Sequence, residues 1–509
     1  MRRTMRERVW GSRSEGWMFW SMTVAVALAM SLISSTAAEA QDGGSVGSFS
    51  PLSTFEVPGE GVAEIVDATP DGGTLVYTDS DGGTVGIVDL SDPAEPSLVG
   101  EPVLVDGTPT SVSVSPDGTL ALVAVQTSTL EEGEAPEITP GLLVAVDIAN
   151  QEVVGSVEIG AGPDSLAVEE IGGELVAVVA IENEPVVVDN DGNQTDEEAP
   201  GSEGDVSDPG VVQVVTVDRE DIAASEVADV DLNLSETDLL FQDDPQPEFV
   251  SLSPDGRAAV SLQENNGLAV FDVAAAAGEG AVASVYSLGV VEDRPADLTA
   301  DGEVSFTETY PADVADEQPE AGTRVADAVA WSADASVVYT ANEGEEDFTG
   351  GRGFSAFSSE GALLFDDGGS LEAEAAALDL YPEDVSEEKG TEIEGVETGV
   401  FGDTEFLFVG SEAGSFVAVY NLLGAAEPEF VQILTTGEAP EGLRAIPERN
   451  LLVTADEDSG TISIFEGVLV EDLTGTGGPP LATTAVLVAA LFLVSAILAT
   501  LVAASRRVS

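Results

Sequence analysis

The sequence predicts an all-β protein, a seven-bladed β-propeller with an N-terminal signal segment and a C-terminal transmembrane helix. Short apolar runs on either side of a tight turn recur seven times between Val62 and Gly467. A period of about fifty residues with three or four strands per copy is typical of β-propellers. Within each copy β-branched residues alternate with small or polar ones, as in SVSVSPDG from Ser111, which indicates β-strands. Almost no helical periodicity occurs between the two termini, which excludes an α-solenoid.

The turn between the first two strands of a copy has a clear signature. In the second copy Pro116 presets φ, Asp117 tolerates the tight bend, and Gly118 accepts a positive φ. Matched at their first positions, the copies begin at Glu64, Thr110, Asp164, Glu248, Asp327, Glu394 and Glu441. Fourth strands are predicted from Pro96, Glu152 and Phe430.

Closure of the ring is expected to use the start of the mature chain. The chain leaves the repeats soon after the third strand of the seventh copy. We therefore expect Leu52–Val57 to supply the missing outer strand of the last blade. Each blade of a propeller packs between two neighbours, so this strand ties the first blade to the last.

Four insertions interrupt the even spacing of the copies. Asp189–Gly210 is an acidic loop within the third copy, and Asp218–Pro247 follows it as a linker. Ala274–Gly322 and Asp366–Thr391 lie between later copies. Their composition predicts loops or partial order rather than separate domains.

The N-terminus has the features of an export signal. Five arginines precede an apolar stretch from Trp17 to Ile33, and Ala38-Glu39-Ala40 matches a cleavage site. We expect residues 1–40 to be a signal peptide, with an uncleaved N-terminal anchor as the alternative.

The C-terminus has the features of a membrane anchor. Residues 481–504 carry no charge and are long enough to span a bilayer, and two arginines follow them. This pattern predicts a transmembrane helix, a cytoplasmic tail at 505–509, and an exoplasmic propeller at 41–467. A tether rich in Gly and Pro, residues 468–480, joins the propeller to the helix.

The charge of the chain limits its partners and its chemistry. With 96 Asp and Glu against 15 Lys and Arg, the net charge is −81. Such a field repels nucleic acid and attracts cations. The sequence has neither histidine nor cysteine, which excludes disulfides, thiol nucleophiles, Zn–His sites and Ser-His-Asp triads. Adaptation to a salty exterior is the alternative reason for the acidity, because dense carboxylates keep a protein hydrated and salt screens their repulsion.

Carboxylates recur at equivalent positions of the repeat. Six of the seven copy starts are acidic: Glu64, Asp164, Glu248, Asp327, Glu394 and Glu441. A second set follows the second strands: Glu182, Glu264, Glu343, Glu412 and Glu457. Both sets are expected to share one rim of the central channel. Oxygen ligands without His or Cys favour Ca²⁺; the alternative is that these acids cap strands by accepting backbone N–H groups.

Two further features bear on a binding site. Asp189, Asp191 and Asn193 alternate like the start of a calcium loop, although Gln194 and Pro200 depart from an EF-hand. Among the cations, Arg352 and Lys389 are expected at the rim. Each is predicted to pair with rim carboxylates or to hold an anionic group of a ligand.

A longer set of motifs resembles a known family. The strings PEFVSLSPDG, SLQENNGLAVFDV, YTANEGEE, GGRGFSAF, EEKGTEIEGV, PEGL and TADEDSGTISIFE occur in this order. Together they resemble the choice-of-anchor I family, which includes mesenchyme-specific cell-surface glycoproteins of biomineralising animals. The resemblance implies a surface-anchored propeller and, for the animal members, an association with calcium mineral.

The resemblance also carries residues over to this sequence: Glu182, Glu184, Gln263–Asn266, Asn342, Glu343, Arg352, Lys389, Glu392, Glu394 and Glu441. This chain departs from the family pattern at Gly353, Thr391, Ile393 and Ala413. The segment between ANEG and GGRGFS is also shorter than usual.

Three hypotheses of function follow. The first is a membrane-anchored extracellular binding protein whose acidic rim holds Ca²⁺ and, through it, a protein or glycan partner. The second is a Ca²⁺-dependent hydrolase, a phosphoesterase or lactonase, which needs a metal-activated water because no histidine serves as a base. The third is a ligand-free ring that is acidic for solubility alone.

Overall fold

The computed structural model describes residues 46–59, 61–129, 138–183, 209–237, 239–279, 282–311, 322–344, 350–387, 389–422 and 427–469. The predicted signal peptide (1–40), most of the tether (468–480), the predicted transmembrane helix (481–504) and the tail (505–509) lie outside these residues. Among the helices that are described, none has the length and apolar character needed to cross a membrane.

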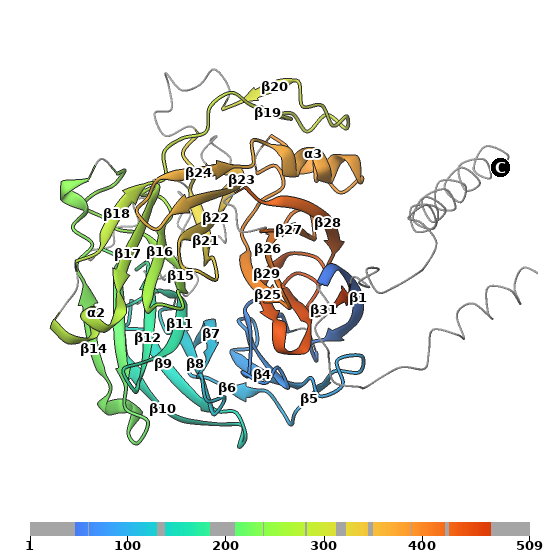
Figure 1. The fold of residues 1–509 in the computed structure, drawn as a ribbon. Coiled ribbons are helices and arrows are strands. Elements are labelled where there is room, and N and C mark those ends of the chain that lie inside the picture. The colour runs from blue at the N-terminus through green and yellow to red at the C-terminus, as the bar shows by residue number, and fades with distance from the viewer. Residues whose placement is uncertain are drawn as a thin grey trace, which may run out of the picture. The chain divides into compact units, whose positions relative to one another are not determined.

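The first three blades are antiparallel sheets, as the repeat predicts (Figure 1). Blade 1 contains β2 (Val66–Ala68), β3 (Thr74–Asp79) and β4 (Thr84–Asp89), with β5 (Ser97–Leu98) and β6 (Val103–Leu104) both paired to β4. Blade 2 contains β7 (Thr108–Val114), β8 (Leu120–Gln126), β9 (Leu142–Asp147) and β10 (Glu152–Glu158). Blade 3 contains β11 (Pro163–Ile171), β12 (Glu174–Ile181), β13 (Val211–Val217) and β14 (Glu226–Val230).

The remaining four blades have four strands each. Blade 4 contains β15 (Pro247–Leu252), β16 (Arg257–Leu262), β17 (Gly267–Asp272) and β18 (Ser284–Ser287). Blade 5 contains β21 (Ala326–Trp331), β22 (Val337–Gly344), β23 (Gly350–Ser358) and β24 (Leu363–Asp366). Blade 6 contains β25 (Val396–Phe401), β26 (Thr404–Ser411), β27 (Phe416–Asn421) and β28 (Glu429–Thr435). Blade 7 contains β29 (Pro440–Ile446), β30 (Leu451–Asp456), β31 (Thr461–Leu469) and β1 (Val46–Glu56).

The blades form a closed ring. The innermost strands β2, β7, β11, β15, β21, β25 and β29 each contact the next, and β29 contacts β2. Between blades the strand faces are buried: Leu75 and Tyr77 of blade 1, for example, pack with Val453 and Ile462 of blade 7. The seven-bladed propeller predicted from the repeat is confirmed.

Ring closure by the N-terminal strand is also confirmed. β1 pairs antiparallel with β31, with Phe55 opposite Ile462, and Figure 1 shows the two strands side by side. The strand is longer than the predicted Leu52–Val57 because it begins at Val46. At this end Phe49 is buried, with ring centroids 5.0–5.3 Å from those of Phe401, Phe406 and Phe408 of blade 6.

The predicted turns have the expected hydrogen bonds. In blade 2 the N–H of Gly118 donates to the carbonyl of Ser115 (2.7 Å), and Gly118 has φ +70°. The Asp117 carboxylate accepts from the Thr119 N–H (3.1 Å) and the Ser115 hydroxyl (2.8 Å). These contacts explain why Asp and Gly recur at this point of the repeat.

The insertions are more ordered than the sequence indicated. Asp218–Pro247, expected as a linker, contains β14, the outer strand of blade 3. The other helices, short helical turns and extra strands lie outside the blades: η1 (Ile222–Ala224), η2 (Leu234–Glu236), α2 (Val273–Glu279), the pair β19 (Arg294–Ala296) and β20 (Glu308–Tyr310), α3 (Ser370–Ala377), η3 (Glu383–Val385) and η4 (Pro447–Arg449).

If β1 closes the ring, replacing its buried Phe49 by a small residue destabilises the whole fold. We expect Phe49→Ala to lower the free energy of unfolding by about 3–5 kcal/mol, the usual loss for a buried Phe. The measurement is chemical denaturation of the full chain at fixed salt. Val153→Ala, at a 42% exposed position of β10, is the control and should change stability by less than about 0.5 kcal/mol. A loss below about 1 kcal/mol for Phe49→Ala would contradict this role.

Candidate functional site

The axis of the ring holds a large cavity, called here the central channel. It has a volume of about 1370 Å³ and is lined by the innermost strands of all seven blades. All the copy starts line it: Glu64, Thr110, Asp164, Glu248, Asp327, Glu394 and Glu441. The six acidic copy starts therefore line one channel, as the repeat predicts.

Strand register explains why the second set of acids meets the first. Antiparallel pairing places the start of each innermost strand opposite the end of the second strand, as in Ala326 opposite Asn342 and Pro440 opposite Asp456. Glu343, Glu412 and Glu457, which end or follow second strands, accordingly line the channel. Glu182 and Glu264 follow the equivalent strands of blades 3 and 4 but are not among the described lining residues.

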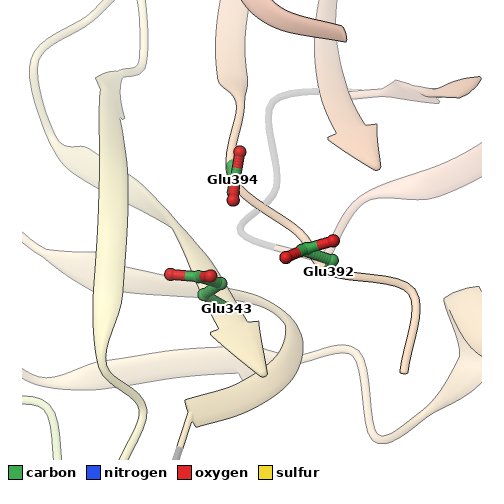
Figure 2. Close-up of side chains that lie close together, drawn as sticks. All are labelled: Glu343, Glu392 and Glu394. Atoms are coloured by element: carbon green, nitrogen blue, oxygen red, sulfur yellow. The ribbon is translucent and has the colours of Figure 1, made fainter. Parts of the chain in front are cut away.

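Three carboxylates form the tightest group at this end of the channel, called here the mouth triad: Glu343, Glu392 and Glu394. One oxygen from each lies within 4.8 Å of the others, and Figure 2 shows the three side chains turned toward a common space. Glu343 is the penultimate residue of β22, whereas Glu392 and Glu394 precede β25. Glu392 was indicated only by the family motif, since its position has no counterpart in the repeat.

Two neighbouring side chains, Gln263 and Lys389, contact the carboxylates of the triad. The Gln263 amide donates to Glu343 Oε2 (2.9 Å). The Lys389 ammonium lies 3.7 Å from Glu343 Oε1 and forms an ion pair with Glu392. Burial opposes the positive charge on Lys389, but Glu392 and Glu343 outweigh it and raise the pKa of the ammonium. Lys389 thus lies at the rim and pairs with carboxylates, as the sequence predicted.

The crowding of like charges shows in the pKa values. Burial, with Glu457 next in importance, raises the pKa of Glu64 well above its ordinary value. Burial, together with Glu64, does the same to the pKa of Glu441. Burial and a hydrogen bond with Glu412 raise the pKa of Glu394. The end of the channel where these acids gather is called here the mouth. Its carboxylates therefore bind protons strongly when no other cation is present.

Strand capping leaves one carboxylate oxygen without a donor in two of the copy starts. Oε2 of Glu64 and Oε2 of Glu441 are buried, and neither has a hydrogen-bond partner among the described residues. Backbone N–H groups therefore do not satisfy these two oxygens. A buried carboxylate oxygen without a donor is stabilised when the carboxyl group binds a proton or a cation.

The other predicted cation does not lie at the rim. Arg352 is fully buried, its guanidinium donates to the carbonyls of Ser386 (2.9 Å) and Asp297 (3.2 Å), and it stacks 4.9 Å from the Tyr310 ring. It does not line the channel, so the expectation of a rim residue is wrong. Its site is an insertion contact, which repeat matching does not reveal.

A cation missed by the sequence analysis lies deeper in the channel. Arg444, in β29, lines the wall. Its Nε lies 2.8 Å from Asp67 Oδ1, and its Nη1 lies 3.7 Å from Glu397 Oε1. Its place directly after PEGL was the available signal. Asp189, Asp191 and Asn193 lie outside the described residues, so the loop proposed there has no structural account.

The fold and the channel define a closed seven-bladed β-propeller with an acidic axial mouth. Residues 64–301 and 347–424 match the choice-of-anchor I domain. The chain belongs to the choice-of-anchor I family.

Solved structures share the fold at low sequence identity. Hydrazine synthase of Kuenenia stuttgartiensis is 15% identical, with a TM-score of 0.50 over 82% of this chain and 97% of that one. The WD40 repeats of RRP9 are 9% identical, with a TM-score of 0.50 over 83% of this chain and all of theirs. At these identities the likeness concerns the propeller fold alone. No curated protein matches the sequence.

The raised pKa values predict an unusual pH dependence without divalent cations. Glu441 keeps its proton in the folded state at a pH where the unfolded chain has lost it, so its contribution to the free energy of unfolding is fully present below about pH 4.5 and is lost as pH rises. We expect Glu441→Gln to make the decline between pH 5 and pH 8 shallower by about 1 kcal/mol. Denaturation midpoints measure this. The exposed Glu429→Gln on β28 should leave the slope unchanged, and an unchanged slope in Glu441→Gln would remove that carboxyl from the account.

Proposed function

We propose that this protein is a surface propeller whose channel mouth binds a divalent cation, Ca²⁺, and through it a protein or glycan partner. Membership of the choice-of-anchor I family indicates a cell-surface or extracellular protein. The observation that carries the cation is the mouth triad, three carboxylates from two blades with oxygens within 4.8 Å of one another.

The donor set fits calcium in chemistry and in size. Ca²⁺ binds oxygen ligands at about 2.3–2.6 Å, so two oxygens on one ion are at most about 5 Å apart. The triad meets that limit without rearrangement of the backbone. Asp327 and Glu412 are close enough to affect the pKa of Glu394, and they supply further oxygens beside the triad. The absence of His and Cys from the sequence disfavours zinc and copper.

Lys389 is the internal competitor for this site. Its ammonium contacts two of the three triad carboxylates, so a divalent cation must displace it. Displacement replaces one charge by two in a strongly negative environment, which favours binding. It also turns an ammonium toward the channel entrance, where an anionic group of a partner meets both the cation and the lysine.

The proposal includes the route of the protein to the surface. The N-terminal segment 1–40 serves export, and 481–504 anchors the chain in the membrane with the propeller outside. The net charge of −81 keeps nucleic acid and anionic surfaces away.

A thermal unfolding titration tests the cation. With the full chain at fixed high NaCl, Ca²⁺ should raise the midpoint saturably, by an amount equivalent to about 2.7 kcal/mol at a hundredfold excess over Kd. Glu343→Gln with Glu394→Gln should abolish the rise, whereas Glu226→Gln, exposed on β14, should keep it. An equal rise with Mg²⁺, or none with either ion, would mean that the carboxylates serve solubility alone.

Removal of the competing ammonium should strengthen binding. We expect Lys389→Met to tighten Ca²⁺ binding at least about tenfold, since a unit charge a few ångströms away contributes several kcal/mol at protein-surface dielectric. Calorimetric titration at fixed salt measures it. Arg219→Met is the matched control, because it removes the same charge from an exposed pair with Asp117. Equal affinities for wild type and Lys389→Met would show that the lysine does not occupy the cation position.

A further inference from the structure

A buried ionic cluster lies behind the channel mouth, at the outer end of blade 5. Arg294 contacts Asp366 (2.6 Å) and Asp367 (3.2 Å), and Arg324 contacts Asp366 (2.8 Å). Both arginine side chains are at most 3% exposed. The cluster joins the β19–β20 insertion to blade 5 and to the segment before α3, and it provides guanidinium partners for both aspartates.

Glu372 is the acid in this cluster that has no such partner. It lies on α3 with 0% exposure, and neither carboxylate oxygen has a hydrogen-bond partner among the described residues. The Tyr381 hydroxyl and the Ser386 hydroxyl, which follow α3, are also buried without partners there. The nearby Arg352 uses its Nη1 for the carbonyls of Ser386 and Asp297 instead. Unsatisfied buried groups on this scale are rare in folded proteins.

The segment between Ser386 and Glu394, of which 386–387 and 389–394 are described, runs from this cluster to the mouth. A Cβ added at Gly390 would clash with Glu372 Oε1 and lie 3.3 Å from Arg352 Cδ. Gly390 has φ +67° and directly follows Lys389. The same segment carries Glu392 and Glu394 of the mouth triad, while its Gly390 lies against Glu372 and Arg352.

We propose that Glu372 and Arg352 position the segment that carries Glu392 and Glu394. The protonation state of Glu372 determines which groups accept hydrogen bonds from the Arg352 guanidinium. With Glu372 neutral, Arg352 holds the carbonyl of Ser386 and fixes the segment. When Glu372 releases its proton to solvent, the buried carboxylate competes for the guanidinium and the hold on Ser386 weakens. The inference rests on the proposed cation site, because it concerns the segment that carries two of its ligands.

The electrostatic surroundings place this change near neutral pH. Burial raises the pKa of Glu372 to about 7, although Arg352 and Arg294 lower it, and Asp367 and Asp297 raise it further. From the segment after α3, Tyr381 faces the same group, and burial raises its own pKa, so it stays neutral. Below pH 7 Glu372 is therefore neutral and the segment is fixed, and above pH 7 it is charged.

The test is a Ca²⁺ titration of the full chain at several pH values. Glu372→Gln is permanently neutral, and Glu374→Gln removes the same charge from an exposed position of α3. Relative to Glu374→Gln, we expect Glu372→Gln to bind Ca²⁺ equally at pH 6 and about three- to tenfold tighter at pH 8, the range for the net contribution of one typical hydrogen bond. A ratio that stays constant with pH overturns the inference and leaves the cation site standing.

A second measurement uses the wild-type protein and so does not depend on the folding of a variant. Hydrogen exchange of residues 386–394 in the wild type, corrected for the intrinsic pH dependence, should lose protection between pH 6 and pH 8. Unchanged protection overturns the positioning role. If no Ca²⁺ binds to the wild type, the proposed function fails; loss of protection in this segment then still supports the Glu372–Arg352 exchange.

Discussion

The constraint on which the rest of the structure depends is the closure of seven similar blades around one axis. Closure brings the matched first position of every copy, at or beside the start of the innermost strand, to the same end of the channel, and six of those seven residues are acidic. The fold thus forces like charges together, and burial raises the pKa values of Glu64, Glu394 and Glu441. β1 maintains this arrangement, because its pairing with β31 ties the start of the ring to its end. The same connection that stabilises the propeller therefore maintains the charge density at its mouth.

Much of this was predictable because it follows from local periodicity. Strand alternation and the Pro-Asp-Gly turns gave the blades, and the matched copy starts gave six channel carboxylates. The missed features come from insertions, where no repeat guides the alignment. Arg352 was expected at the rim because it opens the third strand of the fifth copy, yet the β19–β20 insertion and the segment after α3 bury it. The role proposed for Glu372 could not be predicted for the same reason. It depends on Gly390 and Arg352, which are distant from Glu372 in the sequence but adjacent to it in space.

The acidity of the chain has two components that burial separates. Acids on outer strands, such as Glu226 and Glu429, are exposed, and solvent and salt screen their charges. The mouth carboxylates are shielded from solvent, so salt screens them less, and they gain most from a proton, an ammonium or a metal ion. Exposed charges of the first group suit solubility in salt. The second group lies where solubility gains little from charge, which is the physical reason for assigning it a binding role.

The central claim is that the mouth holds a discrete number of calcium ions, and equilibrium dialysis with radioactive Ca²⁺ in molar NaCl tests it most directly. The account predicts saturable binding with whole-number stoichiometry, little affected by Mg²⁺, and fewer bound ions when Glu343, Glu392 and Glu394 are all changed to Gln. Binding that rises without saturation and is the same in the triple variant would contradict it, because that is the behaviour of a diffuse ion atmosphere around a polyanion.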